Sequence, residues 1–131
     1  MIPGRDLYLE RSELARPANA AIVPVLEAFR GRLVTSNYVV DETVTICRCR
    51  LGFTAAAWLG ERLTSGGGVD VVRVTPEDER AAWALFLQRA DKADIFTDCT
   101  SFVLMRRLAI RQAAATDDDF RREGFAVSPA R

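Results

Sequence analysis

Short apolar runs alternate along the chain with longer stretches of helical period. The runs are rich in β-branched or small apolar residues and predict strands, at residues 32–35, 69–74, 112–115 and 125–127. The other stretches place apolar residues three and four apart and predict helices, at residues 7–14, 18–29, 38–51, 54–63, 76–89, 98–108 and 117–123. Strands that alternate with helices favour a mostly parallel sheet with helices on both faces. We therefore expect a single α/β domain spanning residues 1–131.

Capping residues support several of these helix boundaries. Ser36 or Asn37 can cap the helix at 38–51, and Gly52 ends it. Thr75 stands before the next capped helix, which has acidic residues in its first turn. Thr97 is expected to cap the helix that begins at Asp98.

The composition is that of a folded globular domain without a membrane segment. Of 131 residues, 49% are hydrophobic and 27% charged, and the formal net charge is zero. A neutral chain has no general electrostatic attraction to nucleic acid, so any such contact needs local arginines. No apolar run approaches the ~20 residues of a membrane-spanning helix, and the first residues lack an apolar signal core. These features predict a cytoplasmic protein.

The sequence contains no histidine. Ser-His-Asp and Cys-His nucleophile systems are therefore excluded, as is acid–base catalysis by histidine. Cys47, Cys49 and Cys99 are expected to be reduced, because a Cys-x-Cys spacing without histidine is a poor zinc site. Any catalysis must rest on carboxylates, hydroxyls or metal-bound water.

Acidic residues stand where predicted strands lead into helices. Glu42, Asp98 and Asp117 each lie at or near the start of a helix that follows such a strand. Helical phase places Glu42 at the edge of an apolar arc and Asp41 outside it, and it places Asp98 on the inward side of its helix. A carboxylate beside an apolar face is costly, and a bound cation would relieve that cost.

Acids in a first helical turn have a second explanation. They complement the helix dipole and accept hydrogen bonds from free backbone N–H groups. That interpretation is favoured for Asp118 and Asp119, and for Glu42 and Asp98 when each is considered alone. For Asp117 the two interpretations have equal weight.

Three segments carry a resemblance to a known family. Residues 34–43 read Val-Thr-Ser-Asn-Tyr-Val-Val-Asp-Glu-Thr, and residues 96–102 read Phe-Thr-Asp-Cys-Thr-Ser-Phe. Residues 116–120 read Thr-Asp-Asp-Asp-Phe and are followed by Gly124 and Phe125. In this order they resemble the second, third and closing motifs of PIN-domain nucleases, most closely the VapC toxins of bacterial VapBC toxin–antitoxin pairs. Together the three segments carry the resemblance, which extends over about residues 32–127. No single motif would be sufficient alone.

The resemblance implies a three-layer α/β/α domain with a central, mostly parallel sheet. Its acidic site would bind Mg²⁺ or Mn²⁺ and hydrolyse RNA. Carried over by position, Glu42, Asp98 and Asp117 would be the catalytic, metal-binding carboxylates, and Thr97 and Ser101 would position water or phosphate. Such chemistry suits this chain, because Mg²⁺ prefers oxygen ligands and needs no histidine. A cognate antitoxin and a homodimer are further implications.

One departure concerns the family's first motif, a strand that carries Asp followed by Thr or Ser. When Leu7 and Tyr8 are aligned with the residues after that strand, Pro3 stands in place of the Asp and the first strand is truncated. On that alignment we expect an impaired Mg²⁺-dependent endoribonuclease. The alternative is a non-catalytic PIN-like binding or interaction domain. A phosphoacceptor receiver domain ranks far behind, because the only lysine, Lys92, lies in an acidic loop.

Overall fold

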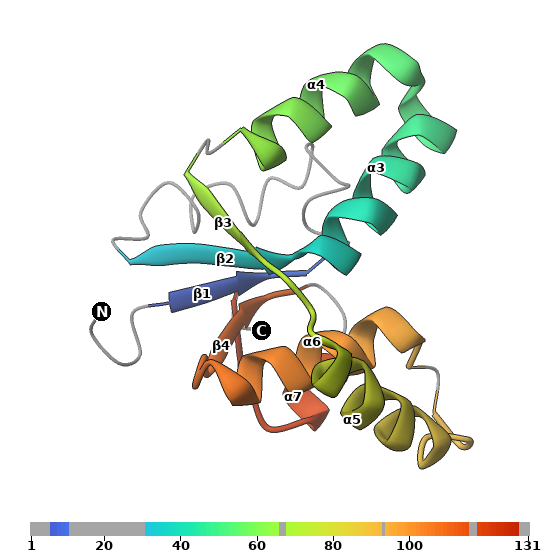
Figure 1. Ribbon diagram of the computed structural model, residues 1–131, viewed down its shortest axis with the longest axis vertical. Coiled ribbons are helices and arrows are strands. Elements are labelled where there is room, and N and C mark those ends of the chain that lie inside the picture. The colour runs from blue at the N-terminus through green and yellow to red at the C-terminus, as the bar shows by residue number, and fades with distance from the viewer. Residues whose placement is uncertain (1–5, 11–30, 66–67, 93, 116–117, 129–131) are drawn as a thin grey trace.

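The strands form one five-stranded parallel sheet in the order β3-β2-β1-β4-β5 (Figure 1). The structure, a computed structural model, describes residues 6–10, 31–65, 68–92, 94–115 and 118–128. The strands are β1 (Asp6–Leu9), β2 (Arg32–Ser36), β3 (Val69–Val72), β4 (Gln112–Ala114) and β5 (Ala126–Ser128). Every pairing between neighbouring strands is parallel, which confirms the predicted α/β class.

The helices lie close to their predicted positions. They are α3 (Asn37–Leu51), α4 (Phe53–Thr64), α5 (Pro76–Leu87), α6 (Phe96–Arg107) and α7 (Asp119–Arg122). The helix predicted at 18–29 lies outside the described residues, as does the second half of the one predicted at 7–14. No helix in the described part of the chain is long and apolar enough to span a membrane.

The first strand is present, and the expectation that it is truncated is wrong. Leu7 pairs with Leu33 of β2 on one side and with Gln112 of β4 on the other, so β1 is the central strand. Residues 7–9 therefore belong to a strand and do not begin a helix. Leu7, Tyr8 and Leu9 are all buried. The sequence of a strand that is buried on both faces is a continuous apolar run, without alternation of apolar and polar residues. Such a run does not distinguish a strand from a helix.

Alternate side chains of β1 enter two different parts of the core. Tyr8 packs on the side of α6 and α7, where its ring centroid lies 6.4 Å from that of Phe120. Phe102 of α6 meets Phe120 edge to face, with the two centroids 4.8 Å apart. Leu7 and Leu9 point to the other face and pack with Ala114 of β4. Because side chains alternate along a strand, the next residue on the Tyr8 side is Glu10.

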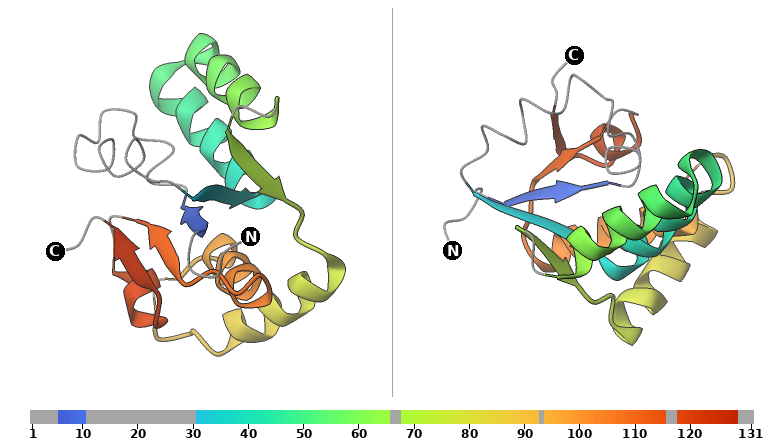
Figure 2. Two further views of the ribbon diagram at one scale, coloured as in Figure 1. Left: turned by 90° about the vertical axis from the view of Figure 1, so that its left-hand side faces the viewer. Right: turned by 90° about the horizontal axis from the view of Figure 1, so that it is seen from above.

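Helices α3 and α4 form an antiparallel pair that projects from the β2–β3 side of the sheet (Figures 1 and 2). The Ser36 hydroxyl starts α3 by accepting a hydrogen bond from the Val39 amide at 3.1 Å. Gly52 separates the two helices at φ 96°, a conformation that favours glycine. Residues 37–64 are referred to below as the α3–α4 arm.

Helix α5 begins as the sequence predicts, and α6 does not. The Thr75 hydroxyl accepts from the Asp78 amide, and the Asp78 carboxylate accepts from the Thr75 amide, which is a reciprocal cap. Helix α6 starts at Phe96, so Thr97 is inside the helix and does not cap it. The Asp98 carboxylate takes that role, accepting from the Ile95 amide at 3.4 Å.

Candidate active site

Glu10 directly follows the central strand at its carboxyl end, and it is a candidate site residue that was not predicted from the sequence. Its amide donates to the Ala114 carbonyl at 3.3 Å, which extends the ladder between β1 and β4 by one bond. Only 1% of Glu10 is exposed. With β1 correctly placed, Glu10 stands where the first motif carries its Asp. The sequence signal for Glu10 is a short apolar run, at residues 7–9, that an acidic residue follows directly.

Asp98 lies in the first turn of α6 and is 4% exposed. Its predicted inward orientation is confirmed, because Phe102 and Met105 on the same helical stripe are also buried. The carboxylates of Glu10 and Asp98 both act on the phenol of Tyr8. Burial raises the pKa of Tyr8 to about 12, hydrogen bonds from Ser101 and Ser36 oppose that rise, and the two carboxylates add to it. Glu10 and Asp98 thus both contribute to the electrostatic environment of Tyr8.

Glu42 lies in the second turn of α3 and is half-buried, whereas Asp41 is exposed, as helical phase predicted. The start of α3 contacts the starts of α5 and α6 through Tyr38. The Tyr38 ring lies 6.2 Å from that of Phe96, and its hydroxyl donates to Glu79 at 2.5 Å. That hydrogen bond is the main reason why the pKa of Tyr38 is raised. The helix that carries Glu42 and the helix that carries Asp98 thus meet at their first turns.

Thr97 and Ser101 flank Asp98 on α6 but differ in access. Ser101 is buried, and its hydroxyl lies 2.7 Å from that of Tyr8. Thr97 is half-buried, and its carbonyl accepts from the Thr100 hydroxyl at 2.6 Å. Ser101 thus supports the Tyr8 side chain beneath the carboxylates, whereas Thr97 is closer to the surface.

Asp98 also belongs to a compact group of carboxylates that the sequence analysis did not identify as a group. Oxygen atoms of Asp94, Asp98 and Asp119 all lie within 4.8 Å of one another. Oxygen ligands at this spacing fit a hard divalent cation, whose bonds to oxygen are about 2.0–2.6 Å long. Asp119 had been assigned to helix capping, and the predicted ligand Asp117 lies outside the described residues. Asp98 is the residue common to the predicted ligands and this group.

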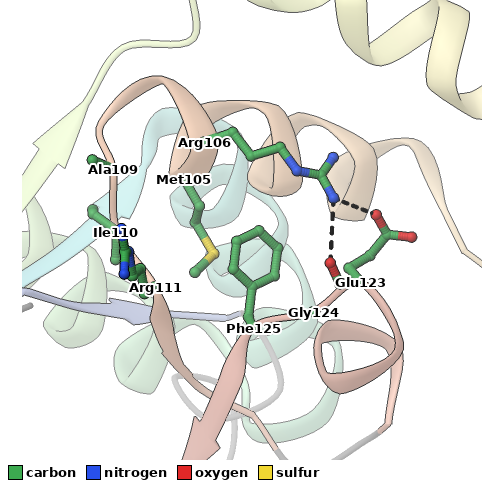
Figure 3. Close-up of a pocket in the computed structure, with 8 residues that line it drawn as sticks. All are labelled: Met105, Arg106, Ala109, Ile110, Arg111, Glu123, Gly124 and Phe125. Carbon is green, nitrogen blue, oxygen red and sulfur yellow. Dashed lines mark hydrogen bonds and ion pairs between the residues drawn. The ribbon is translucent and has the colours of Figure 1, made fainter.

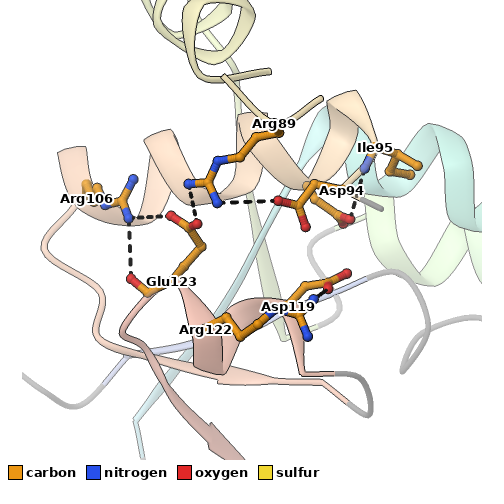
Figure 4. Close-up of polar contacts among 8 residues, drawn as sticks. Arg89, Asp94, Ile95, Arg106, Asp119, Arg122 and Glu123 are labelled. Atoms are coloured by element: carbon orange, nitrogen blue, oxygen red, sulfur yellow. Dashed lines mark hydrogen bonds and ion pairs between the residues drawn. The ribbon is translucent and has the colours of Figure 1, made fainter. Parts of the chain in front are cut away.

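Arginines bind the outer members of the carboxylate group (Figure 4). Arg89 contacts Asp94 at 3.6 Å and also pairs with Glu123, which Arg106 contacts at 2.7 Å. Asp119 pairs with Arg122 three residues along α7. These cations offset part of the repulsion between neighbouring carboxylates and hold the walls of the site in place.

A separate hollow of about 440 Å³ lies at the opposite edge of the sheet (Figure 3). It is formed where α6 leads into β4 and where α7 leads into β5, and it is lined by Met105, Arg106, Ala109, Ile110, Arg111, Glu123, Gly124 and Phe125. This is the edge at which β4 and β5 begin, whereas Glu10 follows the end of β1. The hollow is therefore not part of the acidic site.

Comparison with known proteins identifies the same family as the motifs. Residues 8–126 match the PIN domain family. The chain is 38% identical over 94 residues to the 23S rRNA-specific endonuclease VapC20 from two strains of Mycobacterium tuberculosis, a match that covers 71% of this chain and 70% of that protein.

Solved structures agree with that match. The crystal structure of Mycobacterium tuberculosis VapC20, described as a sarcin–ricin loop cleaving toxin, has a TM-score of 0.85 and 29% identity, covering 92% of this chain and 96% of that one. FitAcB from Neisseria gonorrhoeae has a TM-score of 0.66 and 18% identity, covering 92% and 95% of the two chains, and shows the fold alone.

A parallel sheet whose central strand ends in a buried carboxylate, with further acids on the helices around it, defines a PIN domain, and the chain belongs to that family. Within the family it belongs with the VapC ribonuclease toxins. Nucleases of this family generally use divalent metal ions.

Proposed function

We propose that this protein is a metal-dependent endoribonuclease of the VapC toxin type that acts in the cytoplasm. The observation that carries the proposal is the position of Asp98, which is buried in the first turn of α6 with the carboxylates of Asp94 and Asp119 beside it. Carboxylates this close to one another repel, so the arrangement favours the binding of a cation.

The proposed ligands are Asp98, with Asp94 and Asp119 beside it, together with Glu10, Glu42 and Asp117, which are proposed from their positions in the family motifs. The sequence led us to expect that the acid of the first strand is missing. Glu10 would supply that acid, so the reason for expecting an impaired enzyme no longer holds. Glutamate is one methylene longer than aspartate and keeps both carboxylate oxygens. We therefore expect the chain to be active as it stands, and the non-catalytic alternative loses its main argument.

The residues of the chain supply positioning and charge. A bound Mg²⁺ or Mn²⁺ would acidify a water ligand and stabilise charge on the leaving oxygen. Glu10 would come from the end of β1 and Asp98 from α6, and the hydrogen bond between Tyr8 and Ser101 joins these two elements. Thr97 is the hydroxyl better placed to orient water or phosphate, because Ser101 is already bonded to Tyr8.

The proposed substrate is a structured loop of ribosomal RNA, by similarity to the VapC20 relatives. The proposed partners are an antitoxin, usually encoded beside such a toxin, and a second copy of this chain. An antitoxin would present a basic side chain to the carboxylates, where a charge-assisted hydrogen bond is strong.

Cleavage that depends on Asp98 tests the proposal. The full chain is incubated with a synthetic RNA hairpin carrying the sarcin–ricin loop, with Mg²⁺, with Mn²⁺ or with EDTA. Asp98→Asn keeps the size of the side chain and removes its charge, and it should lower the cleavage rate by about 10²-fold or more. It should also abolish the rise in melting temperature that the metal produces by binding the folded state.

Two results would count against the proposal. A metal-induced shift in melting temperature that survives in Asp98→Asn would remove Asp98 from the metal site. Metal binding without cleavage of any RNA tested would favour the non-catalytic domain. Asp119→Asn and Glu42→Gln, measured in the same way, show which carboxylates share the cation with Asp98.

A further inference from the structure

The outer surface of the α3–α4 arm combines exposed aromatic rings with arginines. Phe53 is 67% exposed and Trp58 is 61% exposed, although both are large apolar side chains. The Arg48 guanidinium lies 5.2 Å from the centroid of the Phe53 ring, and that of Arg62 lies 4.9 Å from the centroid of the Trp58 ring. Neither ring is buried in the core, so core packing does not account for either.

Three arginines of the arm have no carboxylate partner among the described residues. Arg48, Arg50 and Arg62 are exposed, and none of them forms an ion pair with a carboxylate among the residues that the structure describes. Arg73 and Arg111 also form none among these residues, whereas Arg32, Arg80, Arg89, Arg106, Arg107, Arg121 and Arg122 each form at least one. From residue 46 to residue 65 the sequence has these three arginines and a single acid, Glu61. Residues 46–65 therefore carry a net positive charge, whereas the arm as a whole, which includes Asp41 and Glu42, is balanced.

The geometry of α3 connects this surface to the candidate active site. Glu42 lies near the start of α3 and Arg50 near its end. At 1.5 Å per residue, the eight residue steps from Glu42 to Arg50 span about 12 Å along the helix axis. At 100° per residue the two side chains are about 80° apart, on the same side of the helix. A polyanion with one phosphate at the carboxylate site could therefore extend along α3 to the end of the arm.

We propose that the α3–α4 arm binds RNA next to the cleavage site, with Arg50 contacting the phosphate backbone and Phe53 and Trp58 stacking on unpaired bases. The exposed arginines between residues 46 and 65 can bind the phosphates of a polyanion, and aromatic faces with adjacent guanidinium groups are the surface on which nucleobases stack. The inference rests on the proposed RNA cleavage and adds to it a second contact region, at the end of α3 and on α4.

The test measures RNA binding without cleavage. All variants carry Asp98→Asn, and the probe is a fluorescein-labelled hairpin with the sarcin–ricin loop, titrated in EDTA at several salt concentrations. Arg50→Glu should weaken binding about tenfold and lower the salt slope by about one. Trp58→Ala should weaken binding about tenfold, and Trp58→Phe should restore most of it because it keeps an aromatic face. With Asp98 intact, the same arm variants should raise KM and leave kcat nearly unchanged.

Arg111→Glu is the matched control. Arg111 is an exposed arginine that immediately precedes β4, at the opposite edge of the sheet, so the charge change is identical. RNA binding by this variant should stay within about twofold of the parent. Melting temperatures of all variants identify any loss of folding, which is not expected at exposed positions.

Three outcomes would overturn the inference, and they can be told apart. If the arm variants bind RNA as well as Arg111→Glu does, while Asp98-dependent cleavage persists, the arm is not an RNA contact and the proposed function stands. If they keep RNA binding but lose a co-expressed antitoxin, the occupant of the arm is a protein. If the parent neither binds nor cleaves RNA, the proposed function fails together with the inference.

Discussion

Glu10 is the proposed first carboxylate of the site. It follows three buried residues of the central strand, and its backbone is fixed by the hydrogen bond to Ala114. The strand therefore aims its side chain without help from a loop. A side chain on a rigid strand is positioned more accurately than one on a loop, and carboxylate ligands require that accuracy.

We predict that Glu10→Gln removes most of the metal-induced rise in melting temperature and lowers RNA cleavage about 10²-fold, because the amide lacks the negative charge. Glu10→Asp keeps the charge and should keep the metal shift. Calorimetry with and without Mn²⁺ measures the shift. Asp6→Asn is the control, since Asp6 is also buried on β1 but pairs with Arg32 at the other end of the strand. Equal metal shifts in Glu10→Gln and the parent would show that Glu10 is not a ligand.

The two helices that follow β3 are joined by one ion pair. The Asp78 carboxylate on α5 accepts from Nε and Nη2 of Arg107 on α6, both at 2.9 Å, as well as from the Thr75 amide. Burial would raise the pKa of Asp78, but the hydrogen bonds from Arg107 and Thr75 outweigh it and hold that pKa below its usual value. One carboxylate thus caps α5 and fixes its position against the helix that carries Asp98.

We predict that Asp78→Asn lowers the free energy of unfolding at pH 7 by about 2 kcal/mol, with the exposure of Arg107 limiting the loss. A depressed pKa in the folded state stabilises the fold above about pH 4, and this contribution is lost as the pH falls through the folded value. The parent should therefore lose stability below pH 4 more steeply than Asp78→Asn, as measured by urea unfolding between pH 3 and pH 7. Glu77→Gln, at an exposed pair with Arg80, should change stability by less than about 0.5 kcal/mol. Equal acid sensitivity in the parent and Asp78→Asn would contradict the assignment.

The sequence predicted the elements that have strong local signals and failed where those signals are ambiguous. Ser36, Gly52 and Thr75 mark helix boundaries through side-chain hydrogen bonds or backbone conformation, and all three have the predicted role. The central strand was missed because a run buried on both faces shows no period-two alternation. The expectation of a first strand before Leu7 then placed Pro3 at the position of the family's Asp. Glu10 carries the same functional group, a carboxylate. Asp94 lies close to Asp119 because of tertiary packing between α6 and α7. No local pattern in the sequence encodes that packing.

The formal net charge of zero conceals a separation of charge across the molecule. The carboxylates of Asp94, Asp98 and Asp119 gather at the start of α6, whereas Arg48, Arg50 and Arg62 of the α3–α4 arm form no ion pair among the described residues. An RNA that is held by the arm and cut at the carboxylates would use both regions at once. A basic segment of an antitoxin would compete with RNA only at the carboxylates. RNA and antitoxin therefore need not share every contact.

A second exposed apolar surface lies on α5 and differs from the arm in its charge. Trp83 is 53% exposed and Leu87 is 63% exposed, and they are one turn apart on the same helix face. The Trp83 ring stacks on Phe86, with the centroids 5.6 Å apart. The nearest arginines in the sequence, Arg80 and Arg89, both form ion pairs. An apolar surface whose neighbouring charges are balanced suits a protein partner better than a polyanion.

We predict that the proposed homodimer forms through this α5 surface, because in a two-fold dimer each copy presents the same patch to the other. The double variant Trp83→Glu, Leu87→Glu should be monomeric, since it would bury two unpaired charges per copy at the interface. Light scattering coupled to size-exclusion chromatography at about 50 µM measures the mass, a concentration chosen to populate a dimer with a Kd of about 1 µM. The matched control, Phe53→Glu with Trp58→Glu, removes similar exposed apolar area from the arm and should remain dimeric. A dimer that persists in the α5 variant and dissociates in the arm variant would place the interface on the arm and would remove the free surface that RNA binding requires.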